Sequence, residues 1–82
     1  MHNIPKISAA EISENNSLLI TFDNGIKKFY PSELIFKRSE FSILENSPMF
    51  KCLTIEPGGY AISWSDDLDI SENELWLNGV AV

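Results

Sequence analysis

SLLITFDNGIKKFY, residues 17–30, is the stretch of this sequence that decides the fold. Apolar side chains alternate with others from Leu18 to Phe22, which is the period-2 pattern of a half-buried strand. Asn24-Gly25 then favours a tight turn, because glycine tolerates a positive φ freely and asparagine tolerates it better than most residues. The stretch therefore predicts a β-hairpin.

Two loops are compatible with this turn, and they give different registers. The preferred one is a two-residue type I′ loop, which pairs Ile20 with Phe29 and places both side chains on one face. A three-residue loop, residues 23–25 with the glycine in the left-handed region, would instead pair Leu18 with Tyr30 and turn Phe29 to the opposite face. Because an isolated hairpin is only marginally stable, its apolar face must be covered by other segments.

One further strand and several helical turns are predicted around this hairpin. Residues 6–12 alternate weakly and precede turn residues, which predicts a first strand antiparallel to the hairpin. Pro31 ends the hairpin and begins a single helical turn. Ser47-Pro48 is typical of a helix start. The serine hydroxyl can accept a hydrogen bond from a backbone N–H of the first turn. A proline at the first helical position sacrifices no hydrogen bond, because an N–H there would have no partner within the helix. Residues 71–79 have capping-box spacing and predict the last helix.

A second hairpin is predicted from residues 52–56 and 60–64, on either side of a proline-glycine break. Its second strand alternates, so Tyr60 is expected on the same face as Trp64. Cys52 is expected to be a small buried side chain, because the sequence places no histidine near it to activate a thiolate.

Length and composition limit the chain to one small domain. The 82 residues are 44% hydrophobic and include nine aromatic side chains, which is a globular composition. We therefore expect residues 1–82 to form a single α+β domain. Its architecture is predicted to be a small antiparallel sheet built from two β-hairpins plus a first strand, with short helices packed on it.

Charge and targeting features predict the compartment and exclude some partners. The net charge is −6, and residues 49–82 carry six acidic residues against Lys51 alone. Basic residues are too few and too dispersed for direct nucleic-acid binding. The single cysteine, the lack of a signal-peptide pattern and the lack of an apolar run of about 20 residues predict a soluble cytoplasmic protein without a membrane partner.

No residue pattern predicts catalysis, a cofactor or a specific metal site. His2 is the only histidine and lies near a terminus, so it is a poor base and a poor zinc ligand. The acidic run at residues 66–72 resembles a calcium loop only superficially, because Glu72 stands where glycine is needed and Asn78 where a bidentate glutamate is needed. We expect a chain that is not an enzyme.

The strongest functional candidates are aromatic and acidic side chains of the C-terminal part. An alternating strand favours a core position for Trp64, whereas Trp76 lies on a short helix and is more ambiguous. If Trp76 or Leu77 is exposed, an aromatic anchor with an acidic rim would suit a basic partner surface. The candidate partner-binding residues are Trp64, Asp67, Asp69, Glu72, Glu74 and Trp76.

The order of these features resembles a family catalogued as domain of unknown function 2442. The resemblance extends over nearly the whole chain and is most specific in its last third. It rests on Leu18-x-Ile20-x-Phe22-x-Asn24-Gly25, Phe29, Phe41-x-x-Leu44, Phe50, Leu53-x-Ile55, Gly58-Gly59 and Trp64-x-x-x-x-Asp69-Ile70-x-x-x-x-Leu75.

What the resemblance implies is a compact α+β fold in a family of small bacterial proteins without an established activity. Some related chains resemble the N-terminal module of helix-turn-helix proteins, and others are encoded beside a second short protein, as toxins and antitoxins are. Since the sequence stops at Val82, we expect no DNA-binding helix pair after it.

The sequence thus favours a non-enzymatic protein-interaction module, an antitoxin-like or regulatory partner that uses an acidic C-terminal face to bind a protein with a basic surface. The alternative is a small-ligand or divalent-metal-binding domain. Homodimerisation is a further expectation, because an exposed edge of a small sheet must be covered or blunted.

Overall fold

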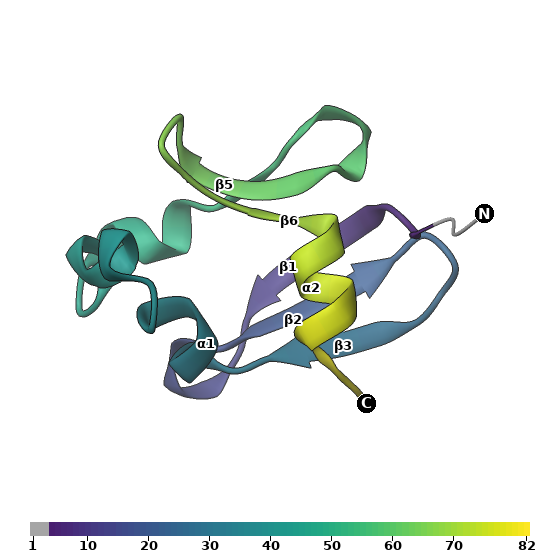
Figure 1. The fold of residues 1–82 in the computed structure, drawn as a ribbon, viewed down its shortest axis with the longest axis horizontal. Coiled ribbons are helices and arrows are strands. Elements are labelled where there is room, and N and C mark those ends of the chain that lie inside the picture. The colour runs from purple at the N-terminus through teal and green to yellow at the C-terminus, as the bar shows by residue number, and fades with distance from the viewer. Residues whose placement is uncertain (1–3) are drawn as a thin grey trace.

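The computed structural model describes residues 4–82, which form two antiparallel sheets and short helices (Figure 1). His2 lies outside the described residues. The α+β class is confirmed. The predicted single sheet is not, because the two hairpins lie in separate sheets. The elements are β1 (Ile7–Ile12), η1 (Glu14–Asn16), β2 (Leu18–Phe22), β3 (Lys27–Tyr30), α1 (Ser32–Phe36), η2 (Ser39–Leu44), η3 (Pro48–Cys52), β4 (Thr54–Ile55), η4 (Pro57–Gly59), β5 (Ala61–Ser65), β6 (Leu68–Ser71), α2 (Glu72–Asn78) and β7 (Val80–Ala81).

The four-stranded sheet has the strand order β1-β2-β3-β7, and the hairpin at its centre uses the three-residue loop. Leu18 pairs with Tyr30, Gly25 has φ +88°, and the Phe22 amide donates to the Ile26 carbonyl at 2.9 Å. The preferred two-residue register was therefore wrong, because only the glycine of the loop adopts a positive φ. Phe29 accordingly lies on the face opposite Tyr30.

The three-stranded sheet has the order β4-β5-β6 and contains the second predicted hairpin. Strand β6 was not predicted, because its acidic residues were interpreted as part of a turn. Tyr60 was predicted to lie in the second strand on the same face as Trp64, but it precedes β5, and its side chain is exposed whereas that of Trp64 is buried. Cys52 ends a 3-10 helix and is also exposed, contrary to the expectation of a buried thiol.

The core lies between one face of the four-stranded sheet and the elements packed on it. Figure 1 shows α2 crossing that face, with the β5–β6 hairpin beside it. Apolar side chains from both sheets and all the longer helices meet there, and aromatic rings of Phe41, Phe50 and Trp64 stack or pack edge to face. The buried cluster comprises Ile7, Leu18, Ile20, Phe22, Tyr30, Ile35, Phe41, Leu44, Phe50, Ile62, Trp64, Ile70 and Leu75.

The predicted helix starts are confirmed by their capping bonds. Ser47 accepts from the Met49 amide at 3.1 Å, and Ser71 accepts from the Glu74 amide at 3.2 Å. The helix α2 ends before Gly79, as predicted from the sequence. Within residues 4–82, no helix is long and apolar enough to cross a membrane.

Candidate functional site

The four-stranded sheet exposes apolar side chains on the face opposite α2. Direct cross-strand pairs align Glu11, Leu19, Phe29 and Val80 in one row across β1, β2, β3 and β7. Directly paired residues of antiparallel strands point to the same side of the sheet. Leu19 and Phe29 are half-buried, Val80 is 57% exposed, and none of the three belongs to the core cluster.

A second row lies beside the first on the same face. It consists of Ala9, Thr21 and Lys27, of which Ala9 and Lys27 are exposed. We call the two rows together the outer sheet face. It contains three large apolar side chains, one acidic residue and one basic residue: Ala9, Glu11, Leu19, Thr21, Lys27, Phe29 and Val80.

Sequence reasoning missed this surface because it depends on the hairpin register. Phe29 and Tyr30 are adjacent aromatic residues, and a shift of one residue exchanges which of them points to the core. The preferred register buried Phe29, whereas the observed one buries Tyr30, which is 1% exposed. A preference for the three-residue loop would have placed Phe29 on the outer sheet face.

Two of the predicted partner-binding residues are tryptophans, and both are used within the fold. Trp64 is 9% exposed, and its indole Nε1 donates to the Phe50 carbonyl at 2.8 Å, so it lies in the core as the strand pattern favoured. Trp76 is half-buried and packs edge to face against Phe22, with ring centroids 5.1 Å apart.

Lys28 also contacts the Trp76 ring. Its ammonium lies 4.0 Å from the ring centroid and donates to the Trp76 carbonyl at 2.6 Å. This cation–π contact and hydrogen bond hold α2 against β3. The neighbouring Leu77 is 66% exposed, so it is the apolar side chain of α2 that solvent reaches most fully.

The four predicted acidic residues divide into two pairs. Asp67 and Asp69 are exposed in the β5–β6 hairpin. Glu72 and Glu74 occupy the first turn of α2 and are half-buried. Glu72 forms an ion pair with Lys6 at 3.3 Å, which ties α2 to the segment before β1. The fold therefore leaves only the aspartates free of the contacts that hold α2.

Glu74 accepts a hydrogen bond from a buried tyrosine instead of completing the capping box. The Tyr30 hydroxyl donates to Glu74 Oε2 at 2.7 Å. Burial raises the pKa of Tyr30 well above its ordinary value, and the bond to Glu74 raises it further. Tyr30 therefore keeps its proton throughout the neutral and mildly alkaline range and continues to position the carboxylate.

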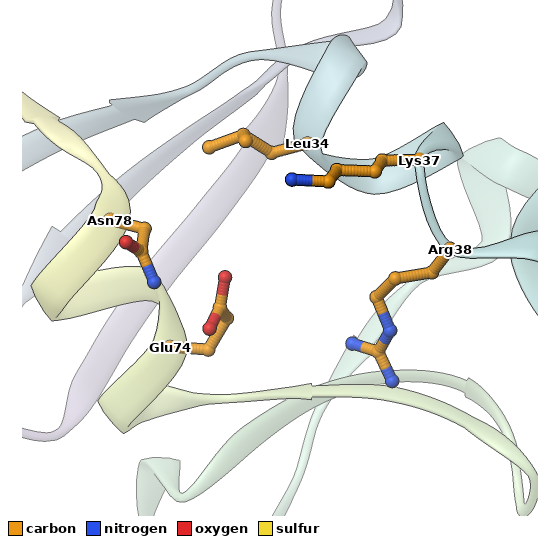
Figure 2. A pocket seen from close by; sticks show the side chains of 5 residues that line it. All are labelled: Leu34, Lys37, Arg38, Glu74 and Asn78. Carbon is orange, nitrogen blue, oxygen red and sulfur yellow. The ribbon is translucent and has the colours of Figure 1, made fainter.

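A pocket of about 360 Å³ lies beside this carboxylate, between α2 and the end of α1. Figure 2 shows Leu34 and Lys37 approaching it from one side, Arg38 from another, and Glu74 and Asn78 from α2. Oppositely charged side chains thus face one space. Of these pocket residues only Glu74 was named from the sequence, as a partner-binding residue, and the separation of α1 from α2 in the sequence explains why no motif indicated the pocket.

Within residues 4–82, no three His, Cys, Asp or Glu side chains group together in a way that could hold a metal ion.

The fold and these surfaces define a small α+β domain with two antiparallel sheets, an exposed sheet face and a mixed-charge pocket. Residues 7–81 match the family described as "Protein of unknown function (DUF2442)", and the chain belongs to that family. The match confirms the resemblance stated from the sequence. No curated protein and no solved structure matches the chain.

Proposed function

We propose that this chain is a non-enzymatic protein-interaction module whose outer sheet face docks a partner protein with a basic surface. The observation that supports this most directly is the row of Leu19, Phe29 and Val80, which the core does not use. Apolar side chains gathered on one sheet face mark interaction surfaces, whereas scattered ones do not.

Docking on this face would gain free energy from apolar burial. Fully burying a large apolar side chain contributes about 1.5–3 kcal/mol, and Leu19 and Phe29 have part of that area still in contact with water. The surrounding charges, Glu11 and Lys27, lie at the margin of the face, where they select a partner more than they add affinity.

The charge of the chain supports a basic partner in preference to a second copy. Two copies, each with a net charge of −6, repel one another, while a basic protein is attracted from a distance. Asp67 and Asp69 are exposed and contribute to that attraction. In this proposal the acidic C-terminal residues speed the encounter, and the outer sheet face forms the contact.

The test compares the wild-type chain with the double variant Leu19→Thr/Phe29→Thr, since threonine retains strand propensity but removes most of the apolar area. The matched control is Ile43→Thr, which changes an apolar side chain that is 73% exposed elsewhere. Each tagged protein is used for affinity purification from its native cells at low and raised salt, after circular dichroism has confirmed folding.

The proposal expects a stoichiometric basic protein that the wild type and the Ile43 variant retain, that the double variant loses, and that raised salt releases. Equal retention by the double variant would place the contact elsewhere and overturn the proposal. Concentration-dependent self-association in sedimentation experiments, lost in the same variant, would also overturn it by assigning the face to a second copy.

The second candidate function is a small-ligand domain, and the pocket beside Glu74 is the observation that favours it. This candidate uses different residues from the outer sheet face, so the two functions are tested separately.

A further inference from the structure

The pocket between α1 and α2 presents both signs of charge to one space. Lys37 and Arg38 follow α1, while Glu74 and Asn78 lie one helical turn apart on α2. Figure 2 shows the carboxylate of Glu74 and the amide of Asn78 directed toward the space that the Lys37 ammonium enters. The pocket is therefore polar on two sides, and Leu34 provides an apolar side.

The opposite charges of the pocket do not neutralise each other directly. Glu74 has no nitrogen of Lys37 or Arg38 within the 4.0 Å of an ion pair, and Arg38 pairs with Glu40 at 2.9 Å instead. A molecule that lies between the two sides of the pocket would therefore be attracted by both of them.

The pocket groups retain hydrogen-bonding capacity for such a molecule. Glu74 uses Oε2 for the Tyr30 hydroxyl, which leaves Oε1 available. Arg38 uses Nε and one terminal nitrogen for Glu40, which leaves its other terminal nitrogen available. Asn78 can both donate and accept. The pocket therefore offers donors on the cationic side and acceptors on the anionic side.

The charged groups of the pocket distinguish ligands by the charges that those ligands carry. A simple anion would be attracted by Lys37 and Arg38 but repelled by Glu74. A simple cation would be attracted by Glu74 but repelled by the two basic side chains. A molecule that carries a carboxylate and an ammonium group at once satisfies both sides. Free α-amino acids have this charge arrangement, and one with an aliphatic side chain would also contact Leu34.

We propose that the pocket binds a free aliphatic α-amino acid, with its carboxylate at Lys37 and Arg38 and its ammonium group at Glu74 and Asn78. The volume of about 360 Å³ lies within the range of small-molecule sites and is ample for such a ligand. The Tyr30 hydroxyl acts as a positioning group, because it holds the Glu74 carboxylate at the edge of the pocket.

The test titrates the isotopically labelled chain with L-leucine and follows backbone amide signals by NMR. We expect saturable shifts at Leu34, Arg38 and Asn78 with a Kd of about 1 mM, as suits a site open to water. N-acetyl-L-leucine lacks the ammonium group and L-leucinamide lacks the carboxylate, so each is expected to bind at least about tenfold more weakly, a loss of about 1.4 kcal/mol.

Two variants make the test specific to the pocket. Lys37→Gln removes one cation and is expected to weaken leucine binding, whereas the control Lys51→Gln makes the same charge change at an exposed lysine of η3 and is expected to leave it unchanged. Glu74→Gln should reverse the preference, so that N-acetyl-L-leucine binds more tightly than L-leucine.

Equal binding of leucine and N-acetyl-leucine by the wild type would assign a carboxylate site and overturn the proposal. Equal binding of leucinamide would assign a cation site and overturn it likewise. Absence of saturable shifts at the three pocket residues would overturn it too. None of these results depends on the outer sheet face, so they leave the interaction module to its own test.

Discussion

Tyr30 shows how one side chain connects the fold to the pocket. Its ring is fully buried on the core face of β3, and its hydroxyl reaches Glu74 on α2 at 2.7 Å. A hydrogen bond to a charged group contributes about 1.5–3 kcal/mol, so this contact helps to hold α2 on the sheet. The same bond orients the only carboxylate of the pocket.

The raised pKa of Tyr30 predicts that the free energy of unfolding depends on pH in the alkaline range. In the unfolded chain the phenol loses its proton near its ordinary pKa of 10.0, while burial and Glu74 keep the folded pKa higher. The folded state therefore binds more protons above pH 10, and stability falls as pH rises through that range. Urea denaturation at increasing pH should show this fall.

The matched variants for this prediction are Tyr30→Phe and Tyr60→Phe. Tyr30→Phe should be less stable at neutral pH and should lose part of the alkaline decline, because phenylalanine does not titrate. Tyr60 is 57% exposed, so Tyr60→Phe removes a phenol hydroxyl outside the core and serves as the matched control. A decline of equal steepness in wild type and Tyr30→Phe would contradict the assignment.

At the residue scale, local chemistry was predicted well and distant contacts were not. Ser47 and Ser71 were correctly placed as helix caps, because a cap depends on residues two or three positions away. The bond between Tyr30 and Glu74 joins residues 44 positions apart, and no local pattern indicates it. The exposure of Cys52 was missed for the same reason, since burial depends on the whole chain.

At the element scale, the turn η4 packs directly against the backbone of β1. Gly59 has φ +75°, and a Cβ built on it would lie 2.4 Å from the Ile7 carbonyl oxygen and 2.8 Å from the Ile7 nitrogen. Both are backbone atoms of β1, so neither can move without moving the strand. Glycine is thus required at this position for two reasons, its backbone angle and its lack of a side chain.

Comparison of Gly59→Ala with Gly25→Ala separates the two reasons. Gly25 also has a positive φ, but a Cβ there would meet nothing within 4 Å. Gly25→Ala should cost about 1–2 kcal/mol for the backbone angle alone. Gly59→Ala should cost a further 1–3 kcal/mol or so for displacing β1. Urea denaturation measures both, and equal losses would show that β1 yields to the methyl group.

The elements were predicted where their signals are local. The first strand, both hairpins and the capped helices follow from alternation, turn residues and caps within a few positions. The register of the first hairpin was predicted wrongly, because both loops accept Asn24-Gly25 and either Phe29 or Tyr30 can fill the core. Strand β7 has only two residues and is a strand because it pairs with β3. No local sequence pattern therefore indicates it.

At the scale of the whole molecule, the excess of acidic residues predicts a response to salt. Within residues 4–82 the ion pairs are Lys6–Glu72, which is partly buried, and Arg38–Glu40, which is exposed and therefore contributes little. With a net charge of −6, repulsion among the remaining carboxylates opposes compaction. Screening by salt should therefore raise the free energy of unfolding, by less than about 1 kcal/mol.

The triple variant Asp66→Asn/Asp67→Asn/Asp69→Asn tests this attribution. These aspartates are exposed on the β5–β6 hairpin, so their replacement should preserve the fold while reducing the net charge. Urea denaturation of the variant should show a weaker dependence on sodium chloride concentration than that of the wild type. An unchanged dependence would show that the repulsion arises elsewhere in the molecule.

The connection of β7 to the four-stranded sheet also has a consequence for the order of folding. Val80 pairs with Phe29 across about 50 intervening residues, which include the whole second sheet, whereas β1, β2 and β3 pair with their neighbours in the chain. Closing such a long loop costs more conformational entropy than closing a hairpin, and it is therefore slower. The three-stranded meander can therefore assemble early, and the fourth strand completes the sheet only after the intervening elements are in place.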